Sequence, residues 1–350
     1  MNAVEDALEN SATLIKSGDW GGALRSLADA HRTQPDPQLA RALADLRHRS
    51  WPYLTTADPR PQPTPSAESI PLGPSGLPEA SLAGLTAADL RAALLTHGTL
   101  YIPRALDGNQ VASLTATIDS AIEAAQAHDR DDEPTTGDTS DGPVWRPLEL
   151  DRECLDAVSG DVVPLHRKFI HEAGGVLLAD APGPMAQLLQ LYESLGLHEL
   201  LSDFLGDRPA MSAQKCTLRR VEPTRMGQWH QDGAFLGSHI RAINIWVPLT
   251  SCGTDAPGLD IINQRLDHIV ETGTRGSYFK WAVGDDVVTD IVGPEGFVRP
   301  TFEAGDMLIF DEMMLHRTAI TPTMTGTRHA VEFWCFAMST YPEGHIPLVW

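Results

Sequence analysis

The sequence predicts a mainly β protein, a sandwich, barrel or jelly roll, with helices packed against one face. The second half of the chain holds short segments rich in β-branched and aromatic residues, separated by Gly, Pro, Asp and Thr turns: CTLRRV, INIWVPL, DIVG, DMLIF and AVEFWCFAM. The first half instead repeats apolar residues at three- and four-residue steps, which indicates helices. No Gly-rich phosphate loop follows a strand, and no helices alternate with the strands, so a doubly wound α/β sheet is disfavoured.

Size and composition are those of a globular protein with its own core. The chain has 350 residues, of which 42% are hydrophobic and 21% charged, and this excludes collagen-like, coiled-coil and wholly disordered classes. Its net charge of −21 would repel a phosphate backbone and an anionic membrane, so we expect neither nucleic acid nor membrane as a partner. The N-terminus lacks the pattern of a signal peptide, and no long apolar run exists, so we expect a cytoplasmic protein. Without any CxxC pair, reduced thiols are expected at the four cysteines, Cys154, Cys216, Cys252 and Cys335.

Residues 1–50 are predicted to be helical and to form a hairpin. The pattern resembles the second half of a tetratricopeptide repeat at Gly18, Trp20, Ala23, Leu27, Ala30 and Pro35. That resemblance suggests a surface for a protein or peptide partner, or for self-association. Such repeats need about three units to bury a continuous core. A helical cap on the main domain is therefore the alternative.

A Pro-rich segment, residues 51–80, is interpreted as a semi-rigid linker that separates these helices from a main domain over residues 81–350. That domain opens with a helix over residues 85–95, a strand in GTLYIPRAL and a second helix in ASLTATIDSAIEAA. The acidic residues 128–143 that follow are predicted to form a solvated surface loop.

The most informative segment for chemistry is Gln228-Trp229-His230-Gln231-Asp232-Gly233. In extended backbone, residues two apart point to the same side, so His230 and Asp232 can present an imidazole and a carboxylate to one ion. A third candidate ligand, His316, follows the strand DMLIF, 84 positions after Asp232. Two histidines and one carboxylate make a facial triad, which binds non-haem iron(II) and leaves positions open for a cosubstrate and dioxygen. A hydrolytic zinc site would more often use three histidines, or two histidines and a glutamate.

Arg328 lies 12 positions after His316, on the next predicted strand. A hairpin centred on Pro322 is expected to place Arg328 across from His316. A guanidinium there could bind a carboxylate through two hydrogen bonds, as a dicarboxylate cosubstrate requires at the end away from the metal.

Together these residues resemble the phytanoyl-CoA dioxygenase family of iron(II)- and 2-oxoglutarate-dependent oxygenases. The resemblance rests on HQDG, on His316 with Thr318 two residues later, on Arg328, and on the upstream stretch LRAALLTHGTLYIPRALDGNQVASLTATIDSAIEAA, and it covers roughly residues 85–340. It implies a double-stranded β-helix, the jelly-roll or cupin-like fold, which agrees with the strand-rich second half.

The resemblance also implies roles for individual residues. Iron(II) would be held by His230, Asp232 and His316, and the distal carboxylate of 2-oxoglutarate by Arg328. Gln231, Trp246 and Thr318 would line the cosubstrate pocket, and Gln214, expected on the strand before the metal segment, would contact 2-oxoglutarate through its amide. Because related halogenases replace the triad carboxylate with a small residue, Asp232 argues against halogenation.

The sequence departs from the family on the substrate side of the pocket. Where many members have a Gly-x-Leu stretch leading to Pro-Gly-Ser-His, this chain has APGLDIINQRLDHIV followed by ETGTRGSYFKWAVGDD. An acyl-CoA substrate is therefore not inherited from the family name. We expect oxidation by iron, 2-oxoglutarate and dioxygen, most simply hydroxylation of a C–H bond in a small molecule or natural-product intermediate. Desaturation, cyclisation or epimerisation at the same centre, and a non-catalytic scaffold role led by the N-terminal helices, are the alternatives.

Overall fold

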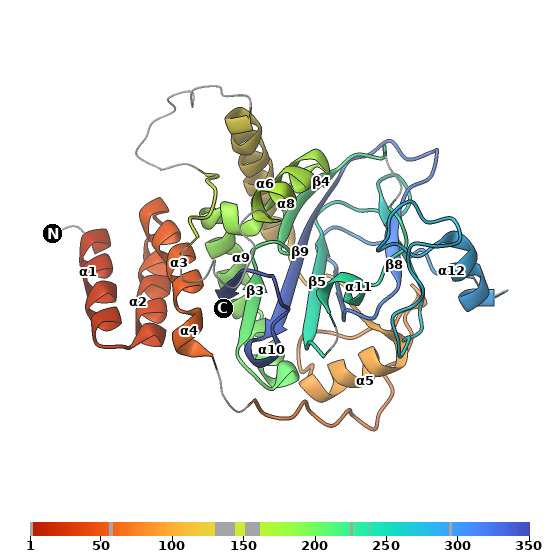
Figure 1. Ribbon diagram of the computed structural model, residues 1–350, viewed down its shortest axis with the longest axis horizontal. Coiled ribbons are helices and arrows are strands. Elements are labelled where there is room, and N and C mark those ends of the chain that lie inside the picture. The colour runs from red at the N-terminus through yellow and green to blue at the C-terminus, as the bar shows by residue number, and fades with distance from the viewer. Residues whose placement is uncertain are drawn as a thin grey trace.

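The computed structural model describes residues 3–55, 59–129, 144–150, 162–224, 227–237, 239–293 and 296–350. The helices of residues 3–54 lie at one side of the molecule, the main β-sheet lies in the middle, and β8 (His316–Ala319) and α12 (Asp285–Val292) lie at the other side (Figure 1). The acidic loop expected over residues 128–143 lies almost entirely outside the described residues, as does Cys154.

The described helices lie mostly in the first two thirds of the chain. They are α1 (Ala3–Lys16), α2 (Trp20–Thr33), α3 (Pro37–Arg49), α4 (Trp51–Leu54), α5 (Ala87–His97), α6 (Gly108–Asp129), α8 (Val162–Glu172), α9 (Pro182–Ser194), α10 (Leu197–Leu205), α11 (Gly233–Leu236) and α12 (Asp285–Val292). The helices predicted from periodicity near residues 85–95 and 112–125 are confirmed as α5 and part of α6. None of the described helices is long and apolar enough to cross a bilayer.

Polar side chains fix where several helices begin. Asp19 accepts a hydrogen bond from a backbone N–H of the first turn of α2, and Asp36 does the same for α3, where Pro37 occupies the first helical position. At α5, Thr86 and Asp89 form a reciprocal capping box. These contacts satisfy N–H groups that have no partner within the helix.

The strands form one large and one small antiparallel sheet. They are β1 (Thr99–Ile102), β2 (Gly175–Leu177), β3 (Pro209–Ser212), β4 (Thr217–Val221), β5 (Ala242–Pro248), β6 (Gly258–Ile261), β7 (Met307–Phe310), β8 (His316–Ala319), β9 (Arg328–Ala337) and β10 (Pro347–Val349). The large sheet has the order β1-β7-β5-β9-β3-β10, with β4 pairing both β9 and β2, whereas β6 and β8 make the small sheet. This antiparallel, helix-flanked core is the double-stranded β-helix predicted from the sequence.

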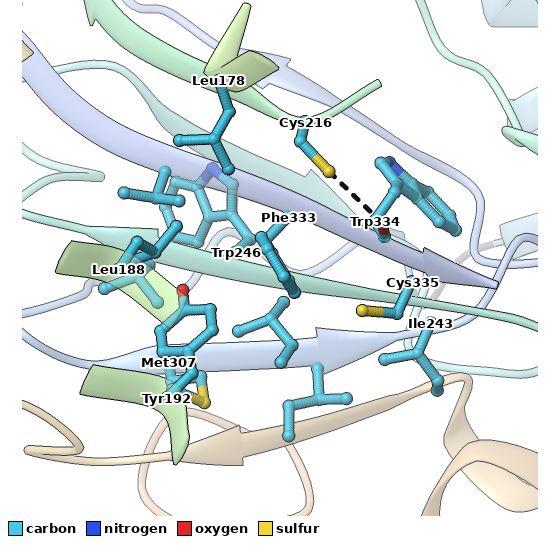
Figure 2. Close-up of a cluster of buried hydrophobic side chains, with 14 of the residues drawn as sticks. Leu178, Leu188, Tyr192, Cys216, Ile243, Trp246, Met307, Phe333, Trp334 and Cys335 are labelled. Atoms are coloured by element: carbon cyan, nitrogen blue, oxygen red, sulfur yellow. Dashed lines mark hydrogen bonds between the residues drawn. The ribbon is translucent and has the colours of Figure 1, made fainter. Parts of the chain in front are cut away.

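The two faces of the large sheet have different partners. Side chains alternate along β9, so Phe333 faces the helices while its neighbours Glu332 and Trp334 face the small sheet. On the helical side, the ring of Tyr192 in α9 lies 5.1 Å from that of Phe333, and Figure 2 shows Leu188 and Met307 in the same buried cluster. On the other side, Trp334 packs with Phe310, whose ring lies 5.1 Å from His316 of β8. The inner face of the large sheet therefore looks toward the metal-ligand candidates.

The N-terminal helices pack on the far edge of the large sheet. Leu39, Leu43 and Leu46 share an apolar cluster with Ala210 of β3 and Val349 of β10. Two side chains of α3 also reach the carbonyl groups of β10: Arg47 Nη1 donates to Val349 O at 2.8 Å, and His48 Nδ1 lies 3.1 Å from Pro347 O. These helices thus cover an edge that would otherwise be open for pairing with another strand.

The described part of the Pro-rich segment packs along the domain. Arg60 N donates to Gly206 O, Ser66 N donates to Ala88 O, and Leu77 is fully buried. In Figure 1 the segment runs from α4 to α5 along one border of the molecule. The division into a helical unit, a linker and a dioxygenase domain stays a prediction.

Three local predictions are wrong. The segment DIVG is the end of α12 and not a strand, because Asp285 and Asp286 occupy the first turn while Val287 and Val288 bury on Trp229 and Leu315. The hairpin centred on Pro322 does not form, since β8 pairs with β6 whereas β9 pairs with β4, β5 and β3. Gln214 lies in the turn between β3 and β4 rather than on a strand.

Candidate metal centre

Two histidines from distant parts of the chain meet through their backbones. His230 N donates to His316 O at 2.9 Å, and His316 N donates to His230 O at 3.0 Å, so the two residues form an isolated antiparallel bridge. Their rings lie side by side with centroids 4.3 Å apart. The bridge extends the small sheet and fixes the spacing of the two imidazoles.

Backbone carbonyl groups orient both rings. His230 Nδ1 lies 2.9 Å from Gln228 O, and His316 Nδ1 lies 3.1 Å from Met314 O. A carbonyl oxygen only accepts, so each Nδ1 must carry the hydrogen. The Nε2 atoms are then the unprotonated ones, which is the arrangement that a metal ligand needs.

Asp232 completes the cluster. It lies at the start of α11, where Gly233 N donates to Glu312 O, and its Oδ2 is 3.8 Å from His316 Nε2. One donor atom from each of His230, Asp232 and His316 falls within 4.8 Å of the others. The predicted triad is therefore assembled, with Asp232 and His316 buried.

Burial also keeps His316 neutral. Desolvation, followed by the nearby His230, lowers the pKa of His316 to about 4, against an opposing effect of Asp232. At neutral pH its imidazole is therefore uncharged, and its Nε2 atom can donate a lone pair to a metal.

The small sheet that carries His316 is held by a buried charge network. Asp260 of β6 is fully buried and accepts hydrogen bonds from Arg299 Nε at 2.6 Å and Arg317 Nε at 2.9 Å. Side chains alternate between the two faces of β8, so His316 and Thr318 project to the side opposite Arg317. Gly227 packs so closely on Thr318 that a Cβ atom at residue 227 would lie 2.8 Å from Thr318 N.

Arg328 is buried at the start of β9 without a carboxylate partner. Its Nη1 donates to Pro257 O and Gly258 O at 3.2 Å each, while its Nε has no hydrogen-bond partner. Among the described residues, no carboxylate lies within ion-pair distance, and the guanidinium carbon lies 5.5 Å from the ring centroid of Trp246. Burial lowers the pKa of Arg328. Trp246 of β5 thus packs against the arginine on the inner face of the large sheet.

Two of the residues predicted to bind the cosubstrate have side-chain amides that form hydrogen bonds with the protein's own backbone. Gln231 is fully buried, its Nε2 donates to His268 O and Met313 O, and its Oε1 accepts from Val270 N. Gln214 Nε2 donates to Gly344 O while its Oε1 accepts from Ile346 N. Both amides therefore anchor backbone in this structure, and their contact with 2-oxoglutarate stays a prediction.

Residues that the sequence interpretation missed also line the site. Lys215 Nζ lies 3.8 Å from Asp232 Oδ1 and 3.6 Å from the ring centroid of Phe235. Glu332 accepts from Thr217 Oγ1 at 2.8 Å and lies 3.4 Å from Arg219 Nε. Burial acts to raise the pKa of Glu332, yet Arg219 and Thr217 hold it below its ordinary value.

Some of the missed residues on the inner face could have been identified from the sequence. Asn244 and Glu332 are polar residues within apolar strand segments, at positions that alternate with core residues, and that pattern marks the inner face of a barrel. Lys215 carries no such signal, because it lies in a turn and approaches Asp232 only through the tertiary fold.

A match to a family model shows which protein family this chain belongs to. The model described as phytanoyl-CoA dioxygenase (PhyH) matches residues 94–329, about two thirds of the sequence. The chain belongs to the phytanoyl-CoA dioxygenase family. A search of curated proteins found no match.

Several solved structures are similar to this phytanoyl-CoA dioxygenase family member. EctD from S. alaskensis, with 2-oxoglutarate and 5-hydroxyectoine, is 17% identical with a TM-score of 0.47, over 82% of this chain and 86% of that one. EvdO2 from Micromonospora carbonacea var. aurantiaca, complexed with 2-oxoglutarate, is 16% identical with a TM-score of 0.41, over 73% of this chain and 92% of that one. SnoK, an alpha-ketoglutarate-dependent carbocyclase from nogalamycin biosynthesis, is 15% identical with a TM-score of 0.47, over 74% of this chain and 87% of that one.

As a member of the phytanoyl-CoA dioxygenase family, the protein is an iron(II)- and 2-oxoglutarate-dependent oxygenase. The donor set fits that cofactor, because two imidazoles and one carboxylate converge within 4.8 Å. The unpaired buried guanidinium of Arg328 likewise fits an anionic cosubstrate.

Proposed function

We propose that His230, Asp232 and His316 hold iron(II), that Arg328 pairs with the distal carboxylate of 2-oxoglutarate, and that the protein hydroxylates a C–H bond of a small molecule. When bound, the iron supplies the dioxygen and electron-transfer chemistry that no protein side chain can supply. The polypeptide supplies the binding, the orientation and the exclusion of water.

The observation that carries the proposal is the buried charge of Arg328, which forms no ion pair among the described residues. A buried cation without an anionic partner is costly for a folded protein, and an added carboxylate would offset that cost through two charge-assisted hydrogen bonds. Arg328 is only 2% exposed and lies on the same inner face as Glu332 and Trp334. A dicarboxylate can therefore pair with Arg328 at one end while its other end lies toward the triad.

Trp246 and Thr318 have supporting roles in this proposal. Trp246 covers the guanidinium from β5 and limits the positions that Arg328 can take. Thr318 projects to the same side of β8 as His316, so its hydroxyl is available to a ligand between the sheets. For Gln231 and Gln214 we propose a structural role, since both amides bind backbone.

Hydroxylation is proposed over the other outcomes because it requires the fewest protein groups beyond the triad. Desaturation, cyclisation and epimerisation need further control of the substrate after the first C–H bond is broken, and no described residue is assigned to that task. A non-catalytic scaffold is disfavoured, because such a protein would need neither an assembled donor cluster nor a buried Arg328 without an ionic partner.

Product mass tests the proposal. The iron-loaded protein is given 2-oxoglutarate, isotopically heavy dioxygen and a panel of candidate substrates, and succinate release identifies the active compound. Hydroxylation predicts a product that has gained one heavy oxygen atom, with no turnover in His316→Ala. A product that has lost two hydrogen atoms, or that is an isomer of the substrate, would refute hydroxylation, and turnover in His316→Ala would refute the triad.

A further inference from the structure

Exposed apolar side chains gather beside the triad. Of the large hydrophobic residues exposed in the described part of the chain, half lie between residues 235 and 297: Phe235, Ile269, Tyr278, Phe279 and Phe297, which are 37%, 39%, 85%, 51% and 40% exposed. Single exposed hydrophobic residues are ordinary, whereas a group of them at one place indicates a binding surface.

Three of the rings in this region form a continuous path outward from a metal-ligand candidate, and we call Phe235, Phe279 and Trp281 the aromatic strip. The ring centroids of Phe235 and Trp281 lie 6.3 Å and 5.6 Å from that of His230, and 6.1 Å from each other. Phe279 then stacks on Trp281, with centroids 5.2 Å apart and ring planes 6° from parallel. The strip therefore leads from the triad to the solvent.

The loop that carries Phe279 and Trp281 is held in place by the segment that carries His230. Tyr278 N donates to Gln228 Oε1 at 2.9 Å, and Val283 N donates to Trp229 O at 2.8 Å. Across the loop itself, Gly273 N donates to Ala282 O at 2.8 Å. These bonds order the strip relative to the metal centre before any ligand arrives, so less conformational entropy is lost on binding.

The shape and chemistry of the strip favour one kind of occupant. Phe279, which is 51% exposed and stacked parallel to Trp281, can bind another flat ring by offset stacking, which adds to the gain from burying apolar area alone. A saturated chain would gain only the buried area. No carboxylate belongs to the strip, and the nearest buried cation, Lys215, already lies over the face of Phe235.

We propose that the aromatic strip is the substrate platform, and that the substrate carries a flat, unsaturated ring system that stacks along Phe279 and Trp281 with its reacting carbon beside the triad. This rests on the proposed function for the position of the reacting carbon. It explains why the segment ETGTRGSYFKWAVGDD, which departs from the family pattern, concentrates aromatic residues at this place.

A pair of neutral probes of similar shape tests the platform. The full-length, metal-free protein is titrated by calorimetry with 2-naphthalenemethanol and, separately, with its decahydro counterpart, which has the same carbon skeleton but no flat ring. We expect the naphthyl compound to bind about tenfold more tightly, as two stacked rings would give. Equal affinities would overturn the proposal.

Matched variants locate the site. Phe279→Leu and Trp281→Leu each keep an apolar side chain but remove the ring, and each is expected to abolish most of the preference for the naphthyl compound. Tyr53→Leu is the control, because Tyr53 is 58% exposed and stacks on Trp20 at 4.1 Å within the N-terminal helices. A preference that survives both strip variants, or is lost in Tyr53→Leu, would overturn the proposal.

The same protein samples separate this proposal from the proposed function. Anaerobic addition of iron(II) and 2-oxoglutarate should give a visible metal-to-ligand charge-transfer band. A normal band together with equal affinity for the two probes would overturn the aromatic platform alone. The absence of a band despite bound iron would instead refute the proposed function.

Discussion

Gln231 separates His230 from Asp232 in the sequence, yet its amide bonds to backbone groups of residues 268, 270 and 313. Its position next to the ligands therefore does not determine its role. Arg328 shows the opposite situation, since it is equally buried but lacks an ionic partner among the described residues. At the scale of single residues, the partners of a side chain separate structural from ligand-binding roles.

Removal of the Gln231 side chain should destabilise the protein more than it affects cosubstrate binding. In Gln231→Ala, three buried backbone groups lose their partner, so we expect the free energy of unfolding of the metal-free protein to fall by about 3 kcal/mol. Urea denaturation measures this, and Gln126→Ala on the exposed side of α6 should change it by less than about 0.5 kcal/mol. Unchanged stability with a large loss of 2-oxoglutarate affinity would restore the cosubstrate role of Gln231.

At the scale of elements, α3 and β10 depend on each other. The helix covers the free edge of the last strand, and Arg47, which is 6% exposed, bonds directly to the carbonyl of Val349. This contact favours the helical-cap interpretation of residues 1–50. A protein or peptide partner for these helices stays a prediction.

Arg47→Leu should be strongly destabilising. The substitution keeps apolar volume but leaves Val349 O buried without its donor, so we expect a loss of about 2 kcal/mol in the free energy of unfolding. Arg32→Leu is the matched control, because Arg32 forms only exposed ion pairs with Asp29 and Glu193 and should cost less than about 1 kcal/mol. Equal effects in the two variants would contradict the edge-covering role of α3.

Removal of residues 1–50 extends this test to the whole element. The truncated chain would expose both the edge of β10 and the apolar cluster beneath α3, so we expect aggregation and a lower unfolding temperature. Size-exclusion chromatography with thermal denaturation would measure this. A monomeric truncated protein of unchanged stability would show that the helices are a separate unit.

At the scale of the whole molecule, buried neutral histidines make stability depend on pH. Burial, with smaller effects of nearby Lys215, lowers the pKa of His166 to about 4 and that of His345 to about 3. In the unfolded chain both pKa values return to about 6.5. Below that pH the unfolded state binds protons that the folded state does not, so stability falls as the pH falls.

His345→Asn tests this dependence. Asparagine can keep the bond that Ser212 Oγ makes with His345 Nδ1 at 2.8 Å but does not titrate. Between pH 6 and pH 4.5 each histidine should contribute a slope approaching about 1.4 kcal/mol per pH unit, so the variant should lose about that much of the slope. Urea denaturation across this range provides the measurement, and an unchanged slope would show that His345 is not buried in its neutral form.

Sequence alone predicted the features that depend on local pattern. The strands β5, β7 and β9 follow from runs of β-branched and aromatic residues, and the clustering of His230, Asp232 and His316 follows from their residue types and order. The β8–β9 hairpin was wrong because the jelly roll sends consecutive strands to different sheets, which local spacing does not encode. DIVG was wrong because helix-start residues and tertiary burial override the strand preference of valine and isoleucine.

Anaerobic titration tests whether Arg328 and the triad together bind 2-oxoglutarate on iron. Iron(II) and 2-oxoglutarate added to the metal-free protein should produce the weak visible metal-to-ligand charge-transfer band. In Arg328→Gln we expect roughly 100-fold weaker affinity for 2-oxoglutarate, since two charge-assisted hydrogen bonds are lost. Arg220→Gln, which removes a surface pair with Asp119, should leave the titration unchanged. Bound iron without a band, or an affinity for 2-oxoglutarate that Arg328→Gln leaves intact, would contradict this joint role of Arg328 and the triad.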